Sequence, residues 1–170
     1  MPALYFLDTS ALLPRLLKRA PGHAWVENLC ASANQNTITL AEVTEAEIAA
    51  SLNQLVRGGT LRKRTCENAL ALFWSQVDGG HYNIIPVVSP IVRRAADLCS
   101  VRALKGYDAI QLACALTARD IARLSDAARV ARGEAALGDP IFLTEDKRLN
   151  EAALTEGFTV DSPLNHLSGN

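Results

Sequence analysis

Short apolar runs alternate along the chain with longer stretches in which apolar residues recur at helical spacing. The short runs are rich in β-branched and aromatic residues, which is typical of strands buried on both faces. The longer stretches repeat their apolar positions every three or four residues, as amphipathic helices do. This pattern predicts strands at 4–7, 37–40, 82–88, 140–143 and 158–160. It predicts helices at 10–19, 22–33, 44–57, 60–78, 89–105, 108–119 and 145–156.

Strands separated by helices favour a parallel sheet with helices on both of its faces. We expect a single domain over residues 1–170, with the last few residues as a tail. In sheets of this kind, ligands bind beyond the carboxyl ends of the strands. That edge of the sheet is therefore where functional side chains are expected.

Carboxylates stand at the ends of predicted strands or at the start of a helix. Asp8 closes the first strand and Asp108 opens an apolar helix. The second strand is followed by Glu42, Glu45 and Glu47, and the fourth by Glu145 and Asp146. Carboxylates crowded into one cleft repel one another, so they raise their pKa values or bind a cation. Hard oxygen ligands suit Mg²⁺ or Mn²⁺, and such an ion can activate water and stabilise the leaving oxygen in phosphodiester cleavage.

Each acid also has a purely structural interpretation. Thr44 and Glu47 match a capping box, in which the glutamate bonds back to the start of its helix. Asp108 and Asp146 lie in first helical turns, where the helix dipole favours a negative charge. Asp8 abuts a buried strand, which is costly unless its carboxylate is hydrogen-bonded or binds a metal. The functional signal therefore lies in the joint arrangement, which depends on the sheet being parallel.

Four blocks of the sequence occur in a characteristic order: 7–12 (LDTSAL), 47–52 (EIAASL), 107–113 (YDAIQLA) and 142–149 (FLTEDKRL). They resemble the motifs of PIN-domain ribonucleases, and most of all the VapC toxins of bacterial and archaeal toxin–antitoxin pairs. The resemblance extends from about residue 4 to about residue 163. It implies a three-layer α/β/α fold around a central parallel sheet of four to five strands.

The resemblance also implies an activity, partners and a site. The implied activity is Mg²⁺- or Mn²⁺-dependent cleavage of RNA, and the implied partners are a cognate antitoxin protein and a second copy in a homodimer. Glu47 would be a metal ligand or the group that orients the attacking water. Ser10 and Thr144 match small hydroxyl positions that line the site, although a helix-capping role explains them equally well. By position, the catalytic and metal-binding carboxylates are Asp8, Glu47, Asp108 and Asp146.

Two of these assignments leave alternatives open. Glu47 is chosen because Ile-Ala-Ala follows it, but the same block also offers Glu42 and Glu45. Asp146 is chosen because a predicted strand precedes it, but Asp126 competes for the fourth position. Asp126 lies in a segment, 119–139, that is longer than the usual link between the third and fourth blocks. Charges at helical spacing in that segment predict a solvated helix.

Cations gather near several predicted turns. The 170-residue chain has 17 Lys and Arg against 18 Asp and Glu, so RNA binding would require local patches rather than a general positive charge. Aromatic residues make up only 5%, which argues against an extended base-stacking platform. Solvated helix ends explain these cations equally well. The candidate RNA-binding residues are Arg15, Arg62, Lys63 and Lys105.

Other chemistries fit the sequence less well. The 3 histidines are scattered and the 4 cysteines form no C-x-x-C pair, which disfavours a zinc site. No apolar run approaches the roughly 20 residues of a membrane span, and no basic leader opens the chain, so we expect a cytoplasmic protein with reduced thiols. Two alternative functions remain: a PIN-fold module that binds protein or RNA without catalysis, and a phosphotransfer domain with Asp8 as nucleophile. The latter would need a second acid where Ser10 stands.

Overall fold

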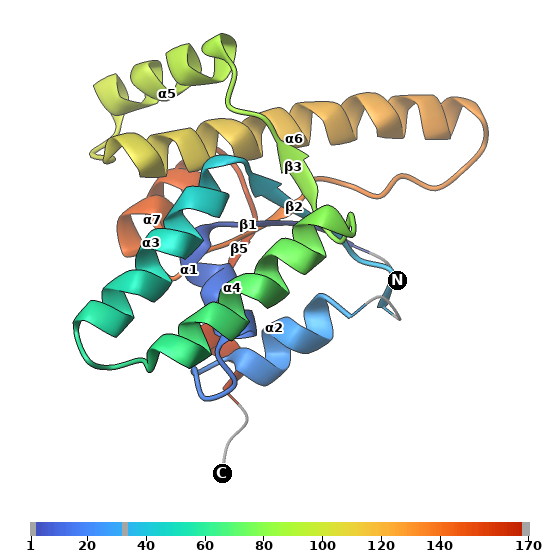
Figure 1. Cartoon of the computed structure of the whole chain (residues 1–170). Coiled ribbons are helices and arrows are strands. Elements are labelled where there is room, and N and C mark those ends of the chain that lie inside the picture. Colours follow the sequence, from blue (N-terminus) through green and yellow to red (C-terminus); the bar gives the residue numbers. More distant parts are fainter. Residues whose placement is uncertain (1–2, 32–33, 168–170) are drawn as a thin grey trace.

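Five parallel strands form the central sheet in the computed structural model, which describes residues 3–31 and 34–167 (Figure 1). Their order is β3-β2-β1-β4-β5, so the first strand of the chain lies in the middle. Phe6 pairs in register with Thr39 on one side and with Phe142 on the other. The last few residues were predicted to form a tail, and of these residues 168–170 lie outside the described part of the chain. The strands are β1 (Leu4–Leu7), β2 (Thr37–Ala41), β3 (Asn83–Ile85), β4 (Ile141–Leu143) and β5 (Val160–Asp161).

Helices cover both faces of the sheet and complete a three-layer α/β/α arrangement, as predicted (Figure 1). One layer consists of α1 (Thr9–Leu16), α2 (His23–Leu29), α3 (Val43–Arg57) and α4 (Lys63–Asp78). The opposite layer consists of α5 (Ser89–Val101), α6 (Gly106–Ala131) and α7 (Lys147–Thr155). A short 3₁₀ helix, η2 (Pro163–His166), follows β5 and contacts α2.

Alternating strand residues supply the two cores. Phe6 and Phe142 face the layer of α5, α6 and α7, where their rings stack with centroids 5.5 Å apart. Leu7 and Leu143, the next residue along each strand, pack against the layer of α1 to α4. Because both faces are buried, the strands are apolar throughout rather than alternating, which is the pattern that predicted a parallel sheet.

The longest helix differs most from the sequence prediction. Instead of ending at residue 119, α6 runs to Ala131 and is 26 residues long in total, because neither glycine nor proline interrupts it before Gly133. Its second half extends beyond the sheet, and the chain then returns to β4 (Figure 1). Leu124, on this half, is 74% exposed, in keeping with the prediction of a solvated helix. Conversely, β3 is shorter than predicted because Pro86 has no N–H to donate to a neighbouring strand.

Two smaller expectations concern thiols and membranes. All four cysteines are free thiols, and Cys66 and Cys114 are buried in the two cores, whereas Cys99 is exposed. Within residues 3–31 and 34–167, no helix has the length and apolarity that a membrane crossing requires.

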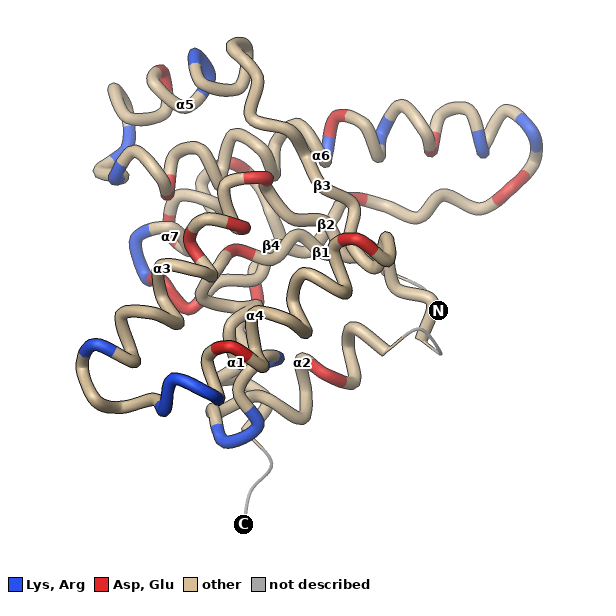
Figure 2. Tube along the Cα trace, in the orientation of Figure 1, with Lys and Arg blue, Asp and Glu red and all other residues tan. Residues whose placement is uncertain are grey.

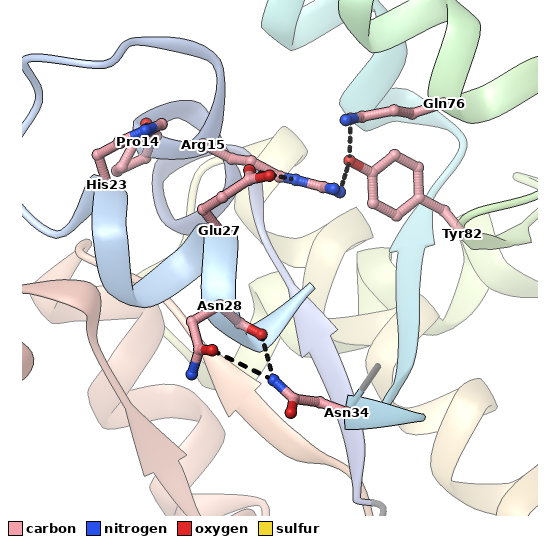
Figure 3. Close-up of polar contacts among 8 residues, drawn as sticks. All are labelled: Pro14, Arg15, His23, Glu27, Asn28, Asn34, Gln76 and Tyr82. Atoms are coloured by element: carbon pink, nitrogen blue, oxygen red, sulfur yellow. Dashed lines mark hydrogen bonds and ion pairs between the residues drawn. The ribbon is translucent and has the colours of Figure 1, made fainter. Parts of the chain in front are cut away.

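Arg15 points into the protein rather than toward solvent (Figure 3). Its Nη1 donates to the hydroxyl of Tyr82 at 2.6 Å, and its Nε donates to Glu27 Oε2 at 3.1 Å. The Tyr82 hydroxyl in turn donates to Gln76 Oε1 at 2.6 Å, so the network joins α1, α2 and α4. The expectation that Arg15 binds RNA is therefore wrong, because buried partners engage its guanidinium group and only 6% of the residue is exposed.

We predict that Arg15→Gln lowers the free energy of unfolding by about 2 kcal/mol, because it removes two hydrogen bonds and leaves buried polar atoms without a partner. Urea denaturation followed by circular dichroism measures this loss. Arg19→Gln is the matched control: Arg19 is exposed three residues beyond the end of α1, and its replacement should change stability by less than about 0.5 kcal/mol. Equal stability of the two variants would contradict a structural role for Arg15.

Candidate active site

A cleft of about 580 Å³ opens at the carboxyl edge of the sheet, and all four predicted acids line it. Asp8 directly follows β1, and Asp146 lies in the loop after β4. Glu47 comes from α3 in one helical layer, and Asp108 comes from the first turn of α6 in the other layer. The cleft therefore lies where both layers meet above the sheet, and it gathers carboxylates from four distant parts of the chain.

The carboxylate of Asp8 is buried and accepts hydrogen bonds on both oxygens. Its Oδ1 accepts from the Ala11 N–H at 2.9 Å, which makes Asp8 the N-cap of α1. The Ser10 hydroxyl donates to Oδ1 at 2.8 Å, and the Thr144 hydroxyl donates to Oδ2 at 2.7 Å. Asp8 is 5% exposed, so these donors replace most of the water that would otherwise solvate its charge.

The same two hydroxyls connect the loops that follow β1 and β4. Ser10 Oγ accepts from the Glu145 N–H at 2.8 Å, and Thr144 Oγ1 accepts from the Asp146 N–H at 3.0 Å. The N-cap of α1 is Asp8 and that of α7 is Asp146, so neither Ser10 nor Thr144 caps a helix. Both hydroxyl residues instead fix the position of a cleft carboxylate.

The second acid is not part of a capping box. Helix α3 begins at Val43 with Glu42 at its N-cap, and no side chain caps it. Thr44 and Glu47 instead direct their side chains toward α6, where both accept hydrogen bonds from the same amide group. The structural interpretation of Glu47 as a capping residue is therefore wrong, and its carboxylate is available at the cleft.

That amide belongs to Gln111, a residue that the sequence analysis did not select. Its Nε2 lies 2.7 Å from Glu47 Oε2, 2.9 Å from Thr44 Oγ1 and 3.3 Å from Thr9 Oγ1. The residue is only 2% exposed, and within the described chain its Oε1 is buried with no hydrogen-bond partner. One signal was present in the sequence: Gln111 is a polar residue on an otherwise apolar helix, three positions after Asp108 and hence on the same face.

The structure separates the acids that the sequence left as alternatives. Glu42 accepts from the Val87 N–H at 2.8 Å, and neither it nor Glu45 lines the cleft. Asp126 accepts from two backbone N–H groups, at residues 137 and 138, where the chain returns from the far end of α6. Asp146 lines the cleft, although its Oδ1 also caps α7 by accepting from the backbone of residues 148 and 149, as the structural interpretation expected.

Burial and repulsion from neighbouring charges disfavour the ionised forms of Asp8 and Asp108. Burial raises the pKa of Asp8 from 3.8 to about 7; its hydrogen bonds partly offset this, and the charge of Glu47 adds to it. The pKa of Asp108 is raised first by burial and then by the charges of Asp146 and Glu47, while Lys105 opposes the shift. A positive charge placed in the cleft would relieve this repulsion.

The donor set suits a hydrated divalent cation better than a bare one. Considering the residues with described positions, no three His, Cys, Asp or Glu side chains form a group that could enclose a metal ion. Mg²⁺ does not need such a cage, because it usually binds one or two carboxylates and keeps several waters. Waters of this kind would also satisfy the buried Oε1 of Gln111, an acceptor that is costly to leave without a partner.

Three of the predicted RNA-binding cations are exposed. Lys105 is the N-cap residue of α6 and lies near Asp108, while Arg62 and Lys63 lie at the start of α4, away from the cleft. Their contact with RNA stays a prediction.

The family model for the PIN domain matches residues 5–154. The chain belongs to the PIN domain family. The match covers every cleft carboxylate and both helical layers. No curated protein sequence matches this PIN domain.

Solved structures share the fold of this PIN domain. PAE2754 from Pyrobaculum aerophilum is 16% identical with a TM-score of 0.57, over 93% of this chain and 83% of that chain. VapBC2 from Rickettsia felis, bound to a DNA fragment from its promoter, is 13% identical with a TM-score of 0.55, over 94% of this chain and 98% of that chain. VapBC-1 from nontypeable Haemophilus influenzae is 13% identical with a TM-score of 0.53, again over 94% of this chain and 98% of that chain. At these identities the likeness establishes the fold alone.

The raised pKa of Asp8 predicts how stability depends on pH in the presence of a chelator. Between pH 4 and pH 7 the folded protein holds a proton on Asp8 that the unfolded chain has lost, so stability falls as the pH rises through this window. Asn cannot ionise. We therefore expect Asp8→Asn to be more stable than the wild type above pH 7, by up to roughly 4 kcal/mol, and similar to it near pH 4.

Thermal or urea unfolding at several pH values in chelator measures this difference. Asp97→Asn, on the exposed surface of α5, is the matched control and should show no such pH-dependent gain. An Asp8→Asn variant that is less stable than the wild type at pH 8 would contradict the charge balance described for the cleft.

Proposed function

We propose that this PIN domain is a Mg²⁺- or Mn²⁺-dependent endoribonuclease and the toxin component of a toxin–antitoxin pair. The observation that carries the nuclease proposal is the cleft itself, where Asp8, Glu47, Asp108 and Asp146 converge from four segments. Like charges held together in this way favour binding of a divalent cation. Membership of the PIN domain family supports the same chemistry.

Each cleft residue has a proposed role that follows from its contacts. Asp8, Asp108 and Asp146 would hold the hydrated ion, one or two of them directly and the rest through its waters. When bound, the ion activates water and stabilises the leaving oxygen. Ser10 and Thr144 keep Asp8 in one orientation by donating to its carboxylate.

Glu47 would orient the attacking water. Gln111 and Thr9 both donate to its Oε2, which fixes the orientation of the carboxylate. Cleavage by an attacking water is expected to leave a 5′-phosphate and a 3′-hydroxyl.

The toxin proposal rests on fold similarity. Two of the solved neighbours are VapBC assemblies, and their folds match nearly the whole of this chain. We therefore propose a cognate antitoxin as the protein partner, RNA as the substrate and a homodimer as the assembly.

Substitution of the cleft acids tests the nuclease proposal. Asp108→Asn and Glu47→Gln should each reduce cleavage of a labelled RNA at least 100-fold in Mg²⁺ or Mn²⁺, because each removes a charge that acts at the reacting centre. The wild type should be inactive in chelator. Asp126→Asn and Glu45→Gln are the matched controls: both residues lie outside the cleft, so these variants should keep wild-type activity.

Two outcomes would reject this assignment. If Asp126→Asn lost activity while an Asp146→Asn variant kept it, the fourth catalytic acid would be Asp126 rather than Asp146. Unchanged cleavage in Asp108→Asn would reject the site. Calorimetric titration with Mn²⁺ provides a separate readout, since metal binding without any cleavage would favour the binding-module alternative.

Expression in cells tests the toxin proposal. Wild-type expression should arrest growth, Asp108→Asn expression should not, and co-expression of the product of a small adjacent reading frame should restore growth. Growth that continues while cell extracts contain active nuclease would contradict the toxin role and leave the nuclease proposal intact.

A further inference from the structure

A second groove, of about 740 Å³, lies between the ends of α1 and α3 and the beginning of α4. Leucines form its floor, among them Leu16, Leu55 and Leu61. Cationic side chains, including Arg19 and Arg62, stand at its rim. None of these residues belongs to the carboxylate cleft, so the groove is a separate surface.

The groove continues the carboxylate cleft along two helices. On α1, Leu13 lines the cleft and Leu16, one helical turn later, lines the groove. On α3, Gln54 lines the cleft and its neighbour Leu55 lines the groove. The ten residues from Glu47 to the end of α3 span about 15 Å at 1.5 Å per residue. One extended ligand could therefore occupy both depressions.

Cations concentrate at the far end of this path. Figure 2 shows Lys and Arg in the turn after α1 close to those in the turn between α3 and α4, while Asp and Glu gather nearer the sheet. This cationic cluster consists of Lys18, Arg19, Arg57, Arg62, Lys63 and Arg64, all exposed. In the described part of the chain, its only salt bridge joins Lys63 to Glu67 at 3.9 Å. Both side chains of that pair are exposed, so the pair contributes little to stability.

We propose that this groove binds the sugar–phosphate backbone of the RNA that is cut in the carboxylate cleft, an inference that rests on the proposed nuclease function. Four carboxylates in the cleft repel a polyanion, and the protein as a whole has a net charge of −1. Attraction must therefore come from a local cationic surface within reach of the same strand. The cationic cluster, about 15 Å along α3, meets this requirement.

The lining of the groove indicates how the strand is held. Thr60, Thr65 and Asn68 line it beside the cations, and hydroxyl and amide groups commonly donate to phosphate oxygens. None of the groove residues is aromatic, so bases cannot stack on it as they do on single-strand binding platforms. Binding at this surface should consequently depend on charge and be tolerant of base sequence.

Binding measured in chelator tests the proposal without cleavage. A fluorescent single-stranded RNA of about 20 nucleotides is titrated at several salt concentrations with the wild type, with Arg19→Gln/Arg62→Gln and with Arg93→Gln/Arg132→Gln. The first double variant should bind about tenfold more weakly, and the slope of log affinity against log salt should fall by about 1.4, at about 0.7 per lost phosphate contact. The second pair, exposed cations on α5 and beyond α6, is the matched control and should behave like the wild type.

Equal affinity and equal salt dependence in the groove variant and the wild type would overturn the proposal, and the groove would then suit an acidic protein segment. Cleavage in Mn²⁺ is measured separately. A raised KM with an unchanged kcat in the groove variant supports the proposal. If the wild type cleaves nothing but the groove variant still loses its salt dependence, the nuclease function fails while the RNA-binding surface stands.

Discussion

Parallel strand pairing is the constraint on which the rest of this molecule depends. Because β1 and β4 are neighbours and run in the same direction, the acids that follow them, Asp8 and Asp146, must emerge at one edge of the sheet. The two helical layers then bring Glu47 and Asp108 to that edge from opposite faces. Folding therefore brings together charges that repel one another, and the energy of the two apolar cores must outweigh this repulsion.

Neutral hydrogen-bond donors make this concentration of charge tolerable. Hydroxyls of Ser10 and Thr144 solvate Asp8, and the amide of Gln111 holds Glu47. Neither network adds positive charge, so neither one neutralises the carboxylates of the cleft. Positive side chains are instead placed farther along α1 and α3. Under the proposed function, the separation of the two charge types would allow one surface to attract a polyanion while the other binds a divalent ion.

The sheet, its two covered faces and the four cleft acids could be predicted because apolar runs and strand-end carboxylates are local patterns. Features decided by tertiary contacts could not. Arg15 looks like any other cation in the sequence, and only the packing of three helices shows that it is buried. Thr44 and Glu47 match a capping box, but the amide of Gln111, more than sixty residues away, competes for both side chains. A solvated helix was expected within 119–139, but the sequence does not show that it continues the helix of 108–119 without a break, which is how α6 reaches Ala131.

The two oxygens of Asp8 serve the architecture whatever chemistry they support, since one caps α1 and the other receives Thr144 from the loop after β4. Selection at this position therefore acts on folding even if catalysis is abandoned. A descendant of this protein that had lost its enzymatic activity would still be under pressure to keep a side chain with a carbonyl oxygen here. Asparagine would satisfy that pressure without a buried charge and an aliphatic residue would not, so an acid that persists at this position in a homologue indicates selection for the charge itself rather than for folding.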